Sequence, residues 1–166
     1  PGYTDIPKDV MQGYELMAAE ACDQLDAAPT HIFLQTGVGG MAAAVAAYTK
    51  RRYGNDRPVI VLADPDQSAC WLESIRHGTP TPVHGDLDTL MAGLACGEIS
   101  GIAWEILRQT ADAVMSVTDD DAVMIINERA GSQCELFHTL RIGLFPSRAS
   151  QTSCWDILPR FNAFGR

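Results

Sequence analysis

The stretch that decides the fold runs from residue 31 to residue 63 and reads HIFLQTGVGGMAAAVAAYTKRRYGNDRPVIVLA. Residues 31–35 and residues 58–63 are short and rich in β-formers, so each segment predicts a buried strand. Between them, a glycine turn is followed by the small side chains of residues 41–48, which favour a helix that packs closely on a sheet. Strand, turn, helix and strand make a βαβ unit. This unit predicts an α/β fold with a parallel sheet in three αβα layers.

Segments on both sides of this unit carry further helix and strand signals. Pro7 suits the first turn of a helix, because its missing N–H would be unpaired there. The apolar spacing that follows is helical, and glycine or proline residues mark where later helices stop. We therefore expect helices at about 10–25, 69–76, 89–96 and 102–114, a short strand at 115–117, and a further helix capped by Asp119-Asp120-Asp121.

Length, composition and charge exclude several classes of protein. The 166 residues suit one domain, and 46% hydrophobic residues are enough for a sizeable core. No run approaches the about 20 apolar residues that span a membrane. The N-terminal residues show no basic stretch followed by an apolar run, so we expect no signal peptide. The net charge of −9 argues against nucleic acid as a partner, since a phosphate backbone requires clustered Lys and Arg.

The cysteines and histidines do not form a metal-binding pattern. The five cysteines are an odd number, widely spaced and never in a C-x-x-C pair, which argues against zinc. The histidines also lack metal-ligand spacing, so we predict no metal site. Reduced thiols are typical of a cytoplasmic protein. We expect Trp71 and Trp104 to be packing residues. The cysteines are Cys22, Cys70, Cys96, Cys134 and Cys154, and the histidines are His31, His77, His84 and His138.

The glycine turn itself, Gly37-Val38-Gly39-Gly40, is a candidate anion site. A strand that ends in glycines and leads into a helix presents free backbone N–H groups and the positive end of the helix dipole, most often to phosphate. The spacing matches neither the Walker pattern nor G-x-G-x-x-G. On local sequence alone, a tight strand-to-helix turn without a ligand explains the motif equally well. A non-catalytic phosphate- or nucleotide-binding βαβ domain is a further alternative.

Several segments taken together resemble the diaminopropionate ammonia-lyase family. The resemblance runs from about residue 1 to about residue 124, and its most specific part is Met91-Ala92-Gly93-Leu94-Ala95-Cys96-Gly97-Glu98, which favours this family over a threonine-dehydratase-like eliminase. The other segments are Gly2-Tyr3, Ile6-Pro7, Met11-Gln12-Gly13-Tyr14, Thr30 to Gln35, Gly37 to Met41, Asp64-Pro65-Asp66 with Cys70, and Ile102 to Arg108.

The resemblance implies the fold of the tryptophan-synthase-β-like enzymes, which depend on pyridoxal 5'-phosphate (PLP). It implies a lyase of amino-acid catabolism that performs α,β-elimination on a small amino acid, 2,3-diaminopropionate, to give pyruvate and ammonia. It also implies a homodimer. By position, it assigns binding of the cofactor phosphate to Gly37, Val38, Gly39, Gly40 and Met41.

The chain departs from this family in its lysines. A PLP lyase holds its cofactor through an imine to a lysine, and this sequence has only Lys8 and Lys50. Lys8 lies in the first turn of the expected N-terminal helix. Lys50 ends the helix after the glycine turn, roughly 15 Å from its start at 1.5 Å per residue. Neither matches the family's lysine, which lies upstream of Gly2 together with the acid–base aspartates. We therefore assign no catalytic residue and expect a fragment that is inactive alone.

The C-terminal part is a different kind of sequence. Residues 129–166 carry five arginines and two acidic residues, a net of +3, whereas the preceding residues carry 7 basic and 19 acidic residues, a net of −12. We expect a partial PLP-binding catalytic domain over 1–126 and an atypical tail over 127–166, read in a shifted frame or from a degenerate gene. The alternative is a divergent C-terminus with its own small core and one short strand within 137–145.

Overall fold

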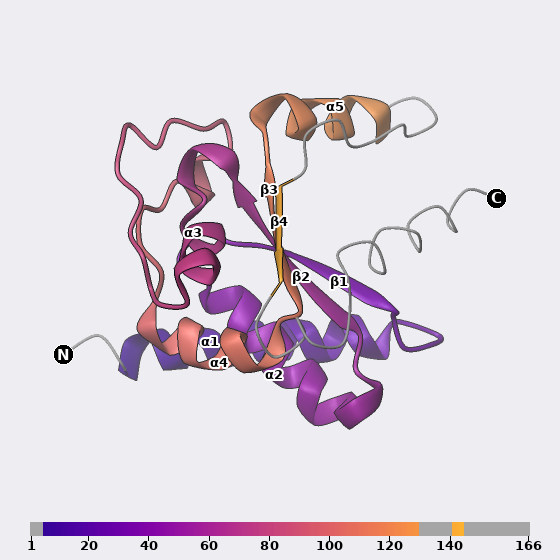
Figure 1. The fold of residues 1–166 in the computed structure, drawn as a ribbon. Helices are drawn as coiled ribbons and strands as arrows, with labels where there is room; N and C mark the ends of the chain where they lie inside the picture. The colour runs from indigo at the N-terminus through magenta and orange to yellow at the C-terminus, as the bar shows by residue number, and fades with distance from the viewer. Residues whose placement is uncertain (1–4, 130–140, 145–166) are drawn as a thin grey trace.

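The computed structural model describes residues 5–129 and 141–144 of the chain (Figure 1). Helices and strands alternate along most of it, and three short 3-10 turns lie between them. The α-helices are α1 (Asp5–Asp23), α2 (Gly40–Tyr53), α3 (Cys70–His77), α4 (Gly101–Thr110) and α5 (Asp119–Arg129). The strands are β1 (His31–Gln35), β2 (Val59–Pro65), β3 (Ala113–Val117) and β4 (Arg141–Leu144).

The strands form one sheet in the order β1-β2-β3-β4. β1 pairs with β2 and β2 pairs with β3, both in parallel, so the α/β class with a parallel sheet is confirmed. The predicted βαβ unit is present as β1, α2 and β2. β4 pairs with β3 in the antiparallel direction and ends the described sheet. It lies within the stretch where the alternative interpretation of the tail placed one short strand.

The main core lies on one face of the sheet. Leu34, Leu62 and Val114 share one row of the strand register. They pack in a single apolar cluster with side chains from α1, α2, α3 and α4. Strand alternation places Val61 and Ala113 on the opposite face, where they form a separate small cluster. α2 contacts both α1 and α4 (Figure 1), and its buried alanines permit this close packing. A second helical layer on the opposite face stays a prediction.

The prediction of a helix over residues 89–96 is wrong. Only Ala92–Leu94 forms a 3-10 turn, and the rest of this stretch is irregular. Gly93 and Gly97 weaken any helix here, because glycine loses more backbone freedom than other residues. The segment instead folds as a tight loop against the glycine turn, where Leu94 and Cys96 lie within 3.4 Å of the position that a Cβ on Gly37 would take.

The helix expected over 102–114 ends early because Asp112 joins the sheet. The Asp112 N–H donates to the carbonyl of Ile60 at 2.9 Å. Its carboxylate accepts two hydrogen bonds from the Arg57 guanidinium, at 2.7 and 2.9 Å, and one from the Ile60 N–H at 2.8 Å. Both side chains of this ion pair are buried. These contacts with Arg57 and with Ile60 of β2 explain why α4 stops at Thr110 and why β3 starts before the expected residue 115.

Some sequence expectations fall on residues outside the described ranges. Most of the predicted tail over 127–166 lies there, as does Gly2-Tyr3 of the family-like segments. The division at residue 126 therefore stays a prediction. None of the helices in the described ranges is long and apolar enough to cross a membrane.

Candidate functional site

The glycine turn joins the carboxyl end of β1 to the first turn of α2. Thr36 continues the hydrogen-bond pattern of the sheet, since its N–H donates to the carbonyl of Ala63 at 2.9 Å. Gly39 then precedes α2 with a φ of +96° and a ψ of 3°, a left-handed conformation that favours glycine. The first helical hydrogen bond runs from the Ala43 N–H to the Gly39 carbonyl at 2.9 Å. The chain thus changes from strand to helix within residues 36–40.

The backbone N–H groups of residues 37–42 have no hydrogen-bond acceptor among the residues that the structure describes. They include the first N–H groups of α2, which a helix always leaves unpaired. Space is open in front of Gly40, since a Cβ there would meet only the Met11 Cγ within 4 Å, at 4.0 Å. Free N–H groups and the positive end of the helix dipole together enable this turn to bind an anion such as phosphate.

A buried carboxylate supports the turn from the neighbouring strand. Asp64 is 1% exposed, and its Oδ1 accepts a hydrogen bond from the Thr36 hydroxyl. Its Oδ2 accepts the N–H groups of Trp71, at 2.8 Å, and Leu72, at 3.3 Å, in the first turn of α3. Burial raises the pKa of Asp64 to about 7, and the hydrogen bonds from Thr36, Trp71 and Leu72 act in the opposite direction. Asp64 therefore links the turn, β2 and α3.

Trp71 contacts the turn directly. Its indole Nε1–H donates to the carbonyl of Gly37 at 3.0 Å. Its ring fills the space beside Gly39, where an added Cβ would lie 2.9 Å from the Trp71 Cε2. The side chain is fully buried, and its ring lies 6.2 Å from that of Trp104, centroid to centroid. Gly39 must therefore lack a side chain both for its backbone conformation and for this ring.

Two thiols also lie close to Gly37. The Cys70 thiol is 3.9 Å from the Gly37 carbonyl oxygen and donates to it. Burial raises the pKa of Cys70 to about 12, so this thiol stays protonated at neutral pH. The Cys96 Sγ lies 3.0 Å from where a Cβ on Gly37 would be. Both cysteines are free.

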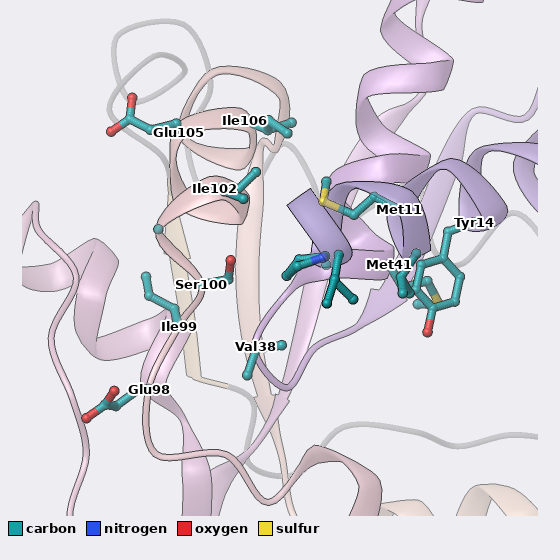
Figure 2. A pocket seen from close by; sticks show the side chains of 15 residues that line it. Met11, Tyr14, Val38, Met41, Glu98, Ile99, Ser100, Ile102, Glu105 and Ile106 are labelled. Carbon is teal, nitrogen blue, oxygen red and sulfur yellow. The ribbon is translucent and has the colours of Figure 1, made fainter. Parts of the chain in front are cut away.

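An apolar groove with a volume of about 1040 Å³ opens beside the turn. Residues of the N-terminal part of α1 and of α4 line it, together with Val38 and Gly40 of the turn and Met41 of α2. Figure 2 shows Met11 and Met41 on one side of the groove, and Ile102 on the other. The turn is thus accessible from a surface that carries mainly hydrophobic side chains.

The predicted site residues Gly37, Val38, Gly39, Gly40 and Met41 lie together in the glycine turn and the first turn of α2, but their role in binding stays a prediction. Lys8 is exposed in the first turn of α1, and Lys50 is exposed in the last turn of α2. Neither lysine makes a hydrogen bond or ion pair with the described residues of the turn. The described ranges also hold no group of three or more His, Cys, Asp or Glu side chains suited to a metal ion.

The roles of Asp64 and Trp71 at the turn could not be predicted from the sequence. The sequence indicates Asp64 only as part of a family-like segment, and Trp71 only as a packing residue of the core. Trp71 does pack there, but it also donates to the turn. No local pattern indicates this contact, because Gly37 lies 34 positions away in the sequence.

The chain is similar to known proteins over most of its described length. Residues 2–133 match the model of a family described as pyridoxal-phosphate dependent enzyme. The chain is 41% identical over 126 residues to diaminopropionate ammonia-lyase of Escherichia coli K12, in an alignment that covers 74% of this chain and 32% of that protein. It therefore spans about a third of the length of this relative.

Solved structures give the same result. The crystal structure of holo diaminopropionate ammonia lyase from Escherichia coli matches with a TM-score of 0.72 and 36% identity, over 81% of this chain and 34% of that one. Threonine deaminase isoform 2 of Solanum lycopersicum matches with a TM-score of 0.64 and 22% identity, over 75% of this chain and 36% of that one, and so shows a shared fold alone. The expected tryptophan-synthase-β-like fold is confirmed, and the chain belongs to the family of pyridoxal-phosphate dependent enzymes.

Proposed function

We propose that the glycine turn binds the phosphate of PLP, and that this chain is the phosphate-binding part of an ammonia-lyase acting on 2,3-diaminopropionate. The observation that carries the proposal is the set of free N–H groups over residues 37–42, in a chain that belongs to a PLP-dependent family. The 41% identity to diaminopropionate ammonia-lyase supports the choice of substrate.

The turn fits a phosphate group in three respects. Gly37, Val38, Gly39, Gly40 and Met41 would hold it through their N–H groups, and the dipole of α2 favours its negative charge. The open space in front of Gly40 gives access. When bound, PLP supplies the electron sink that an α,β-elimination of ammonia from the amino acid requires. The residues of this chain bind and orient the phosphate, whereas elimination belongs to the whole enzyme.

The remaining functional expectations rest on the same family membership. The substrate is a small amino acid, and the enzyme is a cytoplasmic homodimer. The free state of the described cysteines, Cys22, Cys70 and Cys96, supports a reducing compartment. The surplus of acidic residues in the chain supports the absence of a nucleic-acid partner.

A charge placed at the turn tests the proposal. In Gly40→Asp, the new carboxylate occupies open space at the first residue of α2, where an acidic side chain suits the helix dipole. The fold should therefore be kept, while the carboxylate competes with phosphate for the same N–H groups. We expect the Kd for PLP, measured by equilibrium dialysis, to rise at least about tenfold, which corresponds to about 1.4 kcal/mol.

Gly13→Asp is the matched control, because the Cβ position of Gly13 in α1 likewise faces open space, with no heavy atom within 4 Å. This variant should bind PLP as the unmodified chain does. Inorganic phosphate should compete with PLP in both. If Gly40→Asp leaves the Kd unchanged, or if phosphate does not compete, the turn is not the phosphate site.

A further inference from the structure

We propose that Trp71 is a positioning residue that orients the N–H groups of the glycine turn toward the bound phosphate. It does so through its indole N–H on Gly37 and through its backbone N–H, which reaches Thr36 by way of Asp64. This inference rests on the proposed function, because it concerns how the same turn is held.

The indole fixes the first peptide group of the turn. The carbonyl of Gly37 accepts from the buried Nε1–H of Trp71 at 3.0 Å. This carbonyl and the N–H of Val38 belong to one planar trans peptide, so they point in opposite directions. A carbonyl held toward the core thus turns the Val38 N–H away from the core. The other described donor to this carbonyl is the thiol of Cys70, which is much weaker than an indole N–H.

The next peptide group is fixed in a similar way. The carbonyl of Val38 accepts from the N–H of Ser100 at 2.9 Å, just before α4. The N–H of Gly39, in the same peptide, is thereby turned to the opposite side. The ring of Trp71 lies against Gly39 itself. Two consecutive N–H groups are therefore oriented by bonds to their carbonyl partners, and Trp71 contacts both of the glycines involved.

The backbone of Trp71 anchors the residue that precedes the turn. Its N–H donates to Asp64 Oδ2 at 2.8 Å, and Asp64 Oδ1 accepts from the hydroxyl of Thr36. Thr36 and Gly37 are neighbours in the chain. Trp71, at the start of α3, therefore holds Thr36 through Asp64 and Gly37 through its indole N–H. The contact between the indole and Gly37 joins two uncharged groups, so its effect should not depend on salt.

Trp71→Phe separates positioning from packing. The phenyl ring keeps an aromatic group in the core but removes the ring N–H that donates to Gly37. We expect the Kd for PLP to rise about tenfold, as the loss of one buried hydrogen bond would produce. The amide signal of Val38, followed by NMR, should also move less with PLP than in the unmodified chain. A purely structural role would lower thermal stability without changing either quantity in the folded protein.

Trp104→Phe is the matched control. Its ring belongs to the same cluster, but its indole makes no hydrogen bond to the described residues of the turn. The Trp104→Phe variant should be less stable than the unmodified chain but should have the same Kd for PLP. If the unmodified chain and Trp104→Phe both fail to bind PLP, the proposed function is wrong. If the unmodified chain binds PLP and Trp71→Phe binds it equally well, the positioning role of Trp71 is wrong.

A second variant covers the case in which Trp71→Phe does not fold. Thr36→Val has nearly the same shape and removes the hydroxyl that links the turn to Asp64. If the start of α3 positions the turn, this variant should also raise the Kd for PLP, by a few fold, because the indole bond remains. An unchanged Kd in folded Thr36→Val would overturn the role of the route through Asp64.

Discussion

The hydroxyl of Thr36 donates a hydrogen bond to the carboxylate of Asp64 where the carboxyl ends of β1 and β2 lie side by side. Both side chains are buried. The same carboxylate accepts two N–H groups at the start of α3. The Asp64 side chain thus connects the start of the glycine turn to β2 and α3. The ionisation of this carboxyl group therefore affects the stability of the fold.

Asp64 should make stability fall as pH rises through neutrality. An aspartate titrates near 3.9 in an unfolded chain, whereas the folded pKa of Asp64 is about 7. The folded state therefore binds this proton more tightly. The resulting stability is fully present below about pH 4 and is lost as pH rises through about 7. Each unit of difference between the two pKa values corresponds to about 1.4 kcal/mol.

Asp64→Asn tests this prediction, since an amide resembles the protonated carboxyl and can still accept from Trp71 and Leu72. Urea unfolding of the unmodified chain should show a loss of stability, relative to the variant, between about pH 4.5 and about pH 7.5. A constant difference across this range would show that Asp64 does not titrate as its burial requires.

The ion pair of Arg57 and Asp112 should be essential for stability. Arg57→Met leaves the Asp112 carboxylate buried without the guanidinium that donates two hydrogen bonds to it. We expect a loss of about 3–5 kcal/mol in the free energy of unfolding, measured with urea. Arg108→Met is the control, because it breaks an exposed pair with Glu105 and should cost less than about 1 kcal/mol. Equal losses in the two variants would contradict the role of burial.

Gly39 should not tolerate any side chain. Gly39→Ala combines a left-handed φ of +96° with a Cβ that meets the Trp71 ring. It should lower the free energy of unfolding by more than about 1 kcal/mol. Gly13→Ala, in the middle of α1 with open space around it, should raise it by about 0.5–1 kcal/mol. Thermal unfolding compares the two, and a neutral Gly39→Ala would show that the ring does not restrict the turn.

The βαβ unit could be predicted from the sequence because its signals are local. The β-formers of residues 31–35, the glycines that follow and the small side chains of α2 each indicate their own conformation over a few positions. The resemblance to a PLP-dependent family added the prediction that the turn binds the phosphate of PLP. The support of the turn could not be predicted, because Thr36 and Gly37 bind partners 28 and 34 positions further along the chain.

Tertiary contacts also explain why the helix predicted over 89–96 is absent and why the helix predicted over 102–114 ends early. The composition of residues 89–96 permits a helix, but in the structure this segment forms a loop that packs against Gly37. The predicted helix over 102–114 contains Asp112, whose carboxylate binds Arg57. Arg57 lies just before the neighbouring strand β2. In both cases a contact with a distant residue outweighed a weak local preference.

The central proposal is that the N–H groups of residues 37–41 bind the phosphate of PLP. Amide chemical shifts of the ¹⁵N-labelled chain, followed while PLP is added, test this most directly. The largest shifts should fall on residues 37–41, and inorganic phosphate alone should move the same signals. Shifts that concentrate elsewhere, such as along the apolar groove far from the turn, or that phosphate does not reproduce, would contradict the claim.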